Sequence, residues 1–425
     1  MLFNKLTANA WVRNTLWMLL SQGLRLFLQG ISFALAAKAL GPDQYGAFIG
    51  TTALVEILSP FSTLGTGEVM VKQVSRDRTN FARYWGNALW VNFLSAVVLT
   101  LLLVSVVPWI MPNQFTPGLL LLAAVTQLLF GKAIDLSGKA YQAVGQFKRM
   151  AQLLIVPNIL RAIAAVVLFF GIPNPTVFHW FGLSFISLSI AGVAALLAVH
   201  FELGAPKFNW RIKRSELLDG GYFAIGLSAQ TIYNDIDKIM LVRLSTLEAA
   251  GIYAASYRLL DMTFVPLRAV MASSYTRFFQ AGKSGIRGSA QVAKKLIPVM
   301  AGYGVVGAIA LIICAPIVPW ILGSEYQASV IALQWLAPIL ILRALHYIAA
   351  DTLSGADFQA HRSFAQIGVA IANLGLNLYL IPQFPGEAWK GALFASLLSD
   401  GLLMVSLWTI VAVQYRKSLP QVVNS

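Results

Sequence analysis

The sequence carries very little charge for its length. Lys, Arg, Asp and Glu together make up 11% of the 425 residues, whereas an ordinary soluble domain carries about 25%. Hydrophobic residues make up 58%, so soluble domains of this size could not cover their surfaces with polar side chains. The apolar residues occur in blocks of about 20, the length that spans a bilayer core. These features exclude a soluble protein and predict one that crosses a membrane many times.

Cysteine and recognisable catalytic motifs are also scarce. The single cysteine, Cys314, excludes an intrachain disulfide and a Cys-x-x-Cys metal site. The sequence has no P-loop, its four histidines show no metal-ligand spacing, and no connector is long enough for a catalytic domain. The string Gly302–Gly307 matches G-x-G-x-x-G but lies inside an apolar block, where close helix packing is the better interpretation. We therefore expect neither an enzyme nor a bound metal or cofactor.

Twelve apolar blocks are expected to form transmembrane helices, which predicts an all-α polytopic membrane protein. Six blocks lie on each side of a polar stretch, 206–220, which we interpret as a cytoplasmic linker between an N-terminal lobe, 1–205, and a C-terminal lobe, 221–425. The second block is the weakest, because Glu56 and Ser59-Pro60 interrupt it. The predicted spans are 15–37, 46–66, 84–110, 117–140, 150–171, 176–200, 221–243, 249–275, 296–320, 328–352, 364–384 and 390–413.

The basic residues are unevenly distributed between the connectors. Connectors on one side hold most of the 31 Lys and Arg residues, whereas those on the other side hold only Lys38, Arg243 and Lys390. By the positive-inside rule, both termini are expected in the cytoplasm. The net charge of +14 would suggest nucleic acid in a soluble protein. Here it is explained by topology, and no nucleic-acid partner is expected.

A weak internal repeat supports the division into two lobes. Lys38 lies eight residues before Gly46, and Arg243 lies eight residues before Gly251. Since six helices is an even number, both halves enter the membrane from the same side. Repeats of this kind are related by an axis along the membrane normal and have a substrate site between them. The expected architecture is therefore two pseudo-symmetric six-helix lobes around a central cavity.

Ionisable side chains inside the spans are the best candidates for function, because an ion there costs several kcal/mol unless it faces a cavity or a partner. Arginine keeps its charge and binds phosphate with a bidentate fork. Arginines without an acid one helical turn away therefore predict a cationic cavity for an anionic substrate, with pairing to an acid on another helix as the alternative. These arginines are Arg25, Arg161, Arg268 and Arg343.

Two further basic residues are candidates for substrate binding or for pairing along their own helix. Lys132 has Asp135 three residues away, and Arg258 has Asp261 at the same spacing. Side chains three apart share a helix face, so the two charges of each pair can neutralise each other. Both interpretations stay open for both residues.

Acids within the spans are the usual sites of proton or sodium coupling. Glu56, Asp235 and Asp237 are the candidates here. The alternative is that they only neutralise Arg25 and Lys238. Coupling to Na⁺ or H⁺ is thus open.

Three segments carry a resemblance to a known family. The segment Ala36–Gly46, AAKALGPDQYG, resembles the "aR-LGpeeyG" signature after the first helix of polysaccharide flippases, with Lys38 where Arg is usual. These are the Wzx-type proteins of the multidrug/oligosaccharidyl-lipid/polysaccharide exporter superfamily. Asp235–Leu241, followed by Gly251–Tyr253, resembles that family's seventh helix and the turn after it. Asn377–Pro382 resembles the end of its eleventh helix, although the usual Gly-rich link is replaced.

The resemblance implies a flippase for an undecaprenyl-diphosphate-linked oligosaccharide, an O-antigen, capsule or exopolysaccharide unit. Such a protein would move the lipid from the cytoplasmic to the periplasmic leaflet of the bacterial inner membrane by alternating access. It would serve lipopolysaccharide or other polysaccharide biosynthesis, with a polymerase and a chain-length regulator as possible partners. The resemblance does not identify the glycan.

Two other functions compete with this one. A cation-coupled multidrug exporter of the same superfamily would favour acids for binding organic cations, whereas unpaired bases prevail within these spans. A membrane-embedded glycosyltransferase or polymerase would handle the same lipid. It should have a sizeable periplasmic loop, and the outward connectors here are short.

Overall fold

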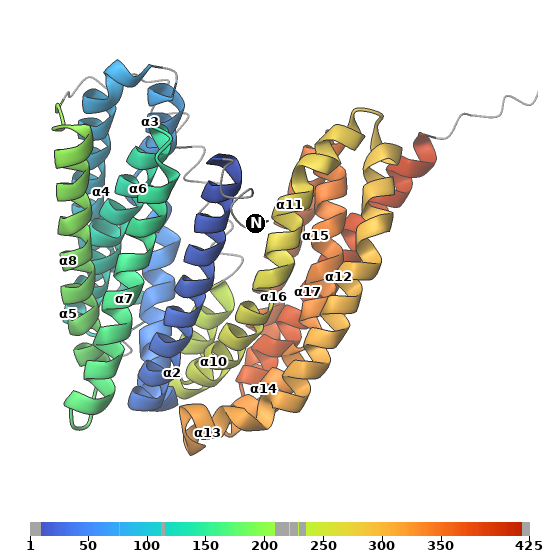
Figure 1. Cartoon of the computed structure of the whole chain (residues 1–425). Coiled ribbons are helices and arrows are strands. Elements are labelled where there is room, and N and C mark those ends of the chain that lie inside the picture. Colours follow the sequence, from blue (N-terminus) through green and yellow to red (C-terminus); the bar gives the residue numbers. More distant parts are fainter. Residues whose placement is uncertain are drawn as a thin grey trace, which may run out of the picture. The chain divides into compact units, whose positions relative to one another are not determined.

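The computed structural model describes residues 10–75, 77–111, 115–208, 221, 228 and 235–418. These residues form helices and no strands. The chain divides into two compact units, Met1–Ile239 and Met240–Ser425, and within each the long helices pack side by side (Figure 1). The predicted linker 206–220 lies mostly outside the described residues, so the proposed lobe boundaries stay a prediction.

The described part of the chain contains nine helical segments that are long and apolar enough to cross a membrane. Large apolar side chains such as Leu101, Ile190 and Ile371 are exposed on them, as expected for surfaces that face lipid. The prediction of an all-α polytopic membrane protein is confirmed. The total of twelve spans stays a prediction. The first two predicted spans fall in one continuous segment, the predicted span 249–275 is not among the nine, and about half of 221–243 lies outside the described residues.

The first unit is built on the longest helix, which packs along α7, while α7 packs on α8 and α4 packs on α5. One core cluster of this unit contains large side chains that are almost fully buried, among them Trp85, Tyr141 and Met70. The helices of this unit are α2 (Ala10–Leu58), α3 (Thr66–Val74), α4 (Phe81–Ile110), α5 (Pro117–Ala124), α6 (Lys132–Ala143), α7 (Phe147–Gly171) and α8 (Val177–Leu203).

Helix α2 contains the first two predicted spans, separated by a kink. At Gly41 the backbone has φ 68° and ψ 171°, and Pro42 follows. Only glycine adopts this conformation without strain, and the proline cannot supply the next helical hydrogen bond. Gly41 and Pro42 of the signature segment 36–46 therefore produce the kink.

The second predicted span, 46–66, is interrupted where its sequence indicated weakness. Helix α2 ends at Leu58, and a 3₁₀ turn covers Ser59–Ser62. Gly65, in the left-handed region with φ 66°, precedes α3. Proline within the turn stops the α-helical hydrogen bonding, so the chain needs two helices rather than one.

The connector between α3 and α4 contains a capping residue, Asp77. The Asp77 carboxylate accepts hydrogen bonds from the backbone N–H of Thr79 at 3.0 Å and from its hydroxyl at 2.7 Å. These bonds, together with one from the side-chain amide of Asn80, lower the pKa of Asp77. The carboxylate thus satisfies donors at the start of the 3₁₀ turn Arg78–Asn80.

The fourth predicted span is helical throughout but contains a π-helical segment, Val125–Gly131, between α5 and α6. Such bulges rotate the side chains that follow and occur frequently at functional sites. Here the bulge carries Gln127, whose amide reaches Glu56 on α2.

In the second unit, α15 is the most central helix and contacts α11, α12, α16 and α17. Gly304 and Gly307 of α12 lie against Ile341 and Leu340 of α15, where an added Cβ would lie 3.2 Å and 2.5 Å from the nearest atom. This confirms the packing interpretation for these two glycines of the G-x-G-x-x-G string. The helices are α10 (Leu247–Thr263), α11 (Val265–Gly282), α12 (Ile286–Cys314), α13 (Val318–Leu322), α14 (Ala328–Leu336), α15 (Ile339–Gly355), α16 (Gln359–Leu380) and α17 (Trp389–Lys417).

The predicted span 249–275 is divided into α10 and α11 at Phe264. Pro266 near the start of α11 has no N–H to donate to the carbonyl of Met262, the helical acceptor four residues earlier. At the same break, the hydroxyl of Tyr303 on α12 donates to the carbonyl of the next residue, Thr263, at 2.9 Å. A break in a membrane helix is stable when a neighbouring helix supplies such a partner.

Candidate functional site

A polar cavity lies inside the first unit and contains two of the predicted site residues. Glu56 of α2 and Arg161 of α7 both line it, together with Gln127 of the π-helical segment. Its volume of about 60 Å³ is enough for a few water molecules. The predicted candidates for ion coupling and for anion binding therefore meet in one cavity.

The contacts of these residues are of two kinds. The amide of Gln127 donates to the Glu56 carboxylate at 2.5 Å. The Arg161 guanidinium lies over two aromatic rings, 5.7 Å from the centroid of Phe48 and 5.5 Å from that of Trp180. Cation–π contacts of this kind stabilise a guanidinium without cancelling its charge.

Two hydroxyl groups lining the same cavity have no hydrogen-bond partner within the described structure. They belong to Thr52 of α2 and Ser184 of α8, and Ser184 is only 5% exposed. Buried polar groups in proteins are nearly always hydrogen-bonded to protein or ordered water. The cavity thus offers room and unused hydrogen-bonding capacity for water or a small ion.

The other predicted residues of the first unit lie elsewhere. Arg25, on the first half of α2, is partly buried. One turn further on, the Gln29 amide donates to Asn158 of α7 at 3.2 Å. Lys132, at the start of α6, forms an ion pair with Asp135 at 3.4 Å, one of the two interpretations left open for it.

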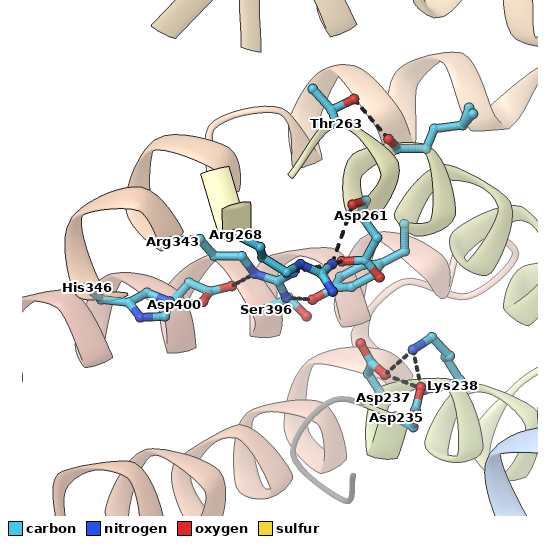
Figure 2. A network of polar contacts seen from close by, with 12 residues as sticks. Asp235, Asp237, Lys238, Asp261, Thr263, Arg268, Arg343, His346, Ser396 and Asp400 are labelled. Carbon is cyan, nitrogen blue, oxygen red and sulfur yellow. Dashed lines mark hydrogen bonds and ion pairs between the residues drawn. The ribbon is translucent and has the colours of Figure 1, made fainter. Parts of the chain in front are cut away.

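The predicted acids Asp235 and Asp237 form a cluster with the lysine that follows them. The Lys238 ammonium lies 2.5 Å from the Asp235 carboxylate and 4.0 Å from that of Asp237 (Figure 2). Asp237 is almost fully buried, while Asp235 is partly exposed. The pairing of Lys238 with Asp235, one of the two interpretations left open, is therefore present.

In the second unit, Arg343 lies at the centre of a network of polar contacts (Figure 2). Its guanidinium is 3.0 Å from Asp261 of α10 and 3.6 Å from Asp400 of α17. It also donates to the hydroxyl of Tyr257, one turn before Asp261. The network continues through Asp400, whose other oxygen lies 3.1 Å from Nε2 of His346.

The network joins three helices because its members are regularly spaced along them. Tyr257 and Asp261 are four residues apart on α10, and Arg343 and His346 are three apart on α15, so each pair shares one face. Asp400 lies opposite on α17. Arg343 and Asp400 are only 12% and 4% exposed. Because both are buried, the positive charge of one neutralises the negative charge of the other.

Arg268, the other predicted arginine of the second unit, lies at the edge of the same network. Its guanidinium is 3.7 Å from the Asp261 carboxylate, and 56% of its side chain is exposed. Arg258, also on α10, is exposed as well. Of the four predicted arginines, the structure therefore brings Arg268 and Arg343 together on one carboxylate.

Several members of these sites were missed as site residues by the sequence reasoning. Gln127, Tyr257 and His346 are the main examples. The spacing of His346 three residues after Arg343 was a usable signal, because it places the ring on the face of the arginine. No comparable pattern indicates Gln127, since the π-helical segment determines where it points.

Comparison with solved structures shows the class of fold. The chain is similar to the inward-facing conformation of a multidrug resistance MATE family transporter of the MOP superfamily, with a TM-score of 0.75 and 13% identity over 95% of this chain and 100% of that one. The outward-facing conformation of such a transporter gives a TM-score of 0.62, at 12% identity over 95% and 96% of the two chains. The chain thus has the two-lobed fold of MOP-superfamily transporters.

A third similar structure is a MOP-superfamily transporter from Pyrococcus furiosus. Its description states that the reverse polarity of its binding pocket suggests a different function. The TM-score is 0.60, at 12% identity over 95% of this chain and 96% of that one. No protein of curated function matches the chain in sequence.

The family is shown by sequence. Residues 11–280, more than half of the chain, match the family described as polysaccharide biosynthesis protein. The chain belongs to this family, as the resemblance of its motifs predicted.

Proposed function

We propose that the protein is a flippase for a lipid-linked oligosaccharide. In this proposal it moves an undecaprenyl-diphosphate-linked unit from the cytoplasmic to the periplasmic leaflet of the bacterial inner membrane by alternating access. The observation that carries the proposal is that a chain with a transporter fold belongs to a polysaccharide biosynthesis family. Together they favour movement of a sugar-bearing lipid over synthesis of one.

The charges within the spans support an anionic substrate. A diphosphate must cross a region where an unpaired ion is expensive. Arginine can replace its lost hydration with charge-assisted hydrogen bonds. We propose that Arg25 and Arg161 in the first unit, and Arg268 and Arg343 in the second, provide this function, with Lys132 and Arg258 as further candidates.

The test is export of polymer in cells that lack the chromosomal gene and carry a plasmid copy. Variants in which one of the four arginines is replaced by Ala should lose export while the protein still reaches the membrane. Arg→Lys should restore export only in part, because Lys keeps the charge but lacks the planar fork. Normal export by all four Ala variants would contradict the proposed binding role.

A second candidate is a cation-coupled drug exporter, favoured by the fold similarity to MATE transporters and by carboxylates such as Glu56 within the spans. It predicts that expression lowers accumulation of organic cations such as ethidium in a strain without other exporters. A flippase leaves accumulation unchanged. The same strain with and without the protein distinguishes the two.

We further propose that Glu56, Asp235 and Asp237 couple transport to H⁺ or Na⁺. The support is that Glu56 lines a cavity with unpartnered hydroxyls, and that Asp235 and Asp237 both lie within 4.0 Å of the Lys238 ammonium. In proteoliposomes, collapsing both ion gradients should slow lipid movement. Unchanged movement would overturn coupling and leave a facilitated flippase.

Both termini are proposed to lie in the cytoplasm. Reporter fusions after Asn174 and Ser324 should report the periplasm, and fusions near Asp77 and Ser284 the cytoplasm. Opposite signals at any two of these positions would contradict the topology. Association with a polymerase or a chain-length regulator remains part of the proposal and can be tested by co-purification.

A further inference from the structure

Arg268 and Arg343 share one carboxylate but differ in their other surroundings. Arg343 is 12% exposed and is held by Asp400 and Tyr257 in addition to Asp261. Arg268 is 56% exposed, and its longer contact with Asp261, 3.7 Å against 3.0 Å, is its single ion pair with a described residue. An incoming anion can therefore reach Arg268 much more easily than Arg343.

The geometry of the helix break places Arg268 next to Asp261. The two residues lie on either side of the break between α10 and α11, and one guanidinium nitrogen also lies 3.4 Å from the backbone carbonyl of Asp261. The Arg268 guanidinium covers the ring of Phe264 within the break, at 5.4 Å. This ring contact does not depend on Asp261, so Arg268 can keep its place when the carboxylate is lost.

Asp261 is itself intermediate in burial, with 36% of its side chain exposed. The same oxygen, Oδ1, faces both arginines. Of the two contacts, the one with Arg268 is longer and more exposed, and an exposed ion pair of this kind is weak. A phosphate group is a stronger partner for arginine, because it offers several charged oxygens to the planar fork.

We propose that Arg268 is the residue of the second unit that contacts the anionic headgroup, and that Asp261 is an exchangeable carboxylate that occupies Arg268 until a diphosphate displaces it. Asp261 then stays with Arg343, so a positioning role anchored by Asp400 replaces the headgroup contact proposed above for Arg343. The inference rests on the proposed function and assigns separate roles within its predicted arginines. It also gives a basis for specificity, since a singly charged headgroup would displace Asp261 poorly.

The test measures binding of inorganic pyrophosphate and of farnesyl diphosphate to the purified full-length protein in detergent, by isothermal titration calorimetry. Asp261→Asn should tighten binding about three- to tenfold, because it removes both the competitor and a negative charge beside the bound anion. Arg268→Ala should weaken binding at least about tenfold, as expected for loss of a charge-assisted contact. In the double variant, Asp261→Asn should give no gain.

Two controls separate this effect from altered folding or altered net charge. Glu387→Gln removes an acid from an exposed pair with Lys390 in the same unit and should leave binding unchanged. Asp261→Glu keeps a carboxylate and should bind close to wild type. If Asp261→Asn does not assemble, Asp261→Ser provides a second neutral side chain with the same expected gain.

The outcomes distinguish the inference from the function on which it rests. If Arg268→Ala weakens binding but both neutral Asp261 variants bind like wild type or more weakly, the exchange is wrong and Asp261 only supports Arg343. The exchange is also wrong if Asp261→Asn tightens diphosphate binding by the same factor in the wild-type background and in the Arg268→Ala background. If the wild type binds neither diphosphate, the proposed anionic substrate itself fails.

Discussion

The two units hold their buried arginines in different ways. In the first unit, Arg161 lies over the rings of Phe48 and Trp180 beside a cavity with unused hydroxyl groups. In the second, Arg343 is enclosed by two carboxylates. Aromatic rings leave the positive charge available to a ligand, whereas carboxylates neutralise it. Arg161 thus lies beside space that water or a ligand can occupy, whereas Arg343 is enclosed by its partners.

The largest expected difference concerns stability. Arg343→Ala leaves Asp400 buried without its main counterion, which should lower the free energy of unfolding by about 3–5 kcal/mol. Thermal unfolding of the purified protein in detergent measures the effect. A double variant, Arg343→Met with Asp400→Asn, removes both charges and should recover most of the loss. If Arg343→Ala unfolds at the wild-type temperature, the network does not stabilise the second unit.

The matching change in the first unit should act on transport instead. Arg161→Ala removes two cation–π contacts, each worth up to about 2 kcal/mol, beside a cavity large enough to admit water. We expect a smaller loss of stability than for Arg343→Ala, together with loss of polymer export at wild-type expression. An Arg161→Ala protein that exports normally, or that is as unstable as the Arg343 variant, would remove the distinction between the units.

The smallest expected effect compares two buried serines. The hydroxyl of Ser396 in the second unit contacts that of Tyr253 at 2.9 Å, so Ser396→Ala should cost about 0.5–1.5 kcal/mol by removing this hydrogen bond. Ser184→Ala removes a hydroxyl without a partner in the described structure and should change stability by less than about 0.5 kcal/mol. Equal losses in thermal unfolding would mean that water or an ion binds Ser184 in the cavity.

The candidate sites show which ion pairs can be predicted from the spacing of residues in the sequence. Residues three or four apart, such as Lys132 with Asp135 and Lys238 with Asp235, form the pairs that the spacing allowed, because a helix fixes its own neighbours. Asp261 also pairs with Arg343, 82 residues away, and lies near Arg268 across a helix break. Spacing carries no information about contacts of this kind, because they depend on which helix packs next.

The sequence by itself determined that the protein crosses the membrane as helices, and it indicated the family through three short motifs. Hydrophobic length and flanking charge are properties of single segments, and they determine whether and in which direction each segment crosses the bilayer. Only the tertiary structure decided that Glu56, Gln127 and Arg161 share a cavity, and that Arg343 is enclosed by acids from two other helices. Those contacts depend on the π-helical segment, the helix breaks and the packing of α15 against its neighbours, which are set by the whole fold.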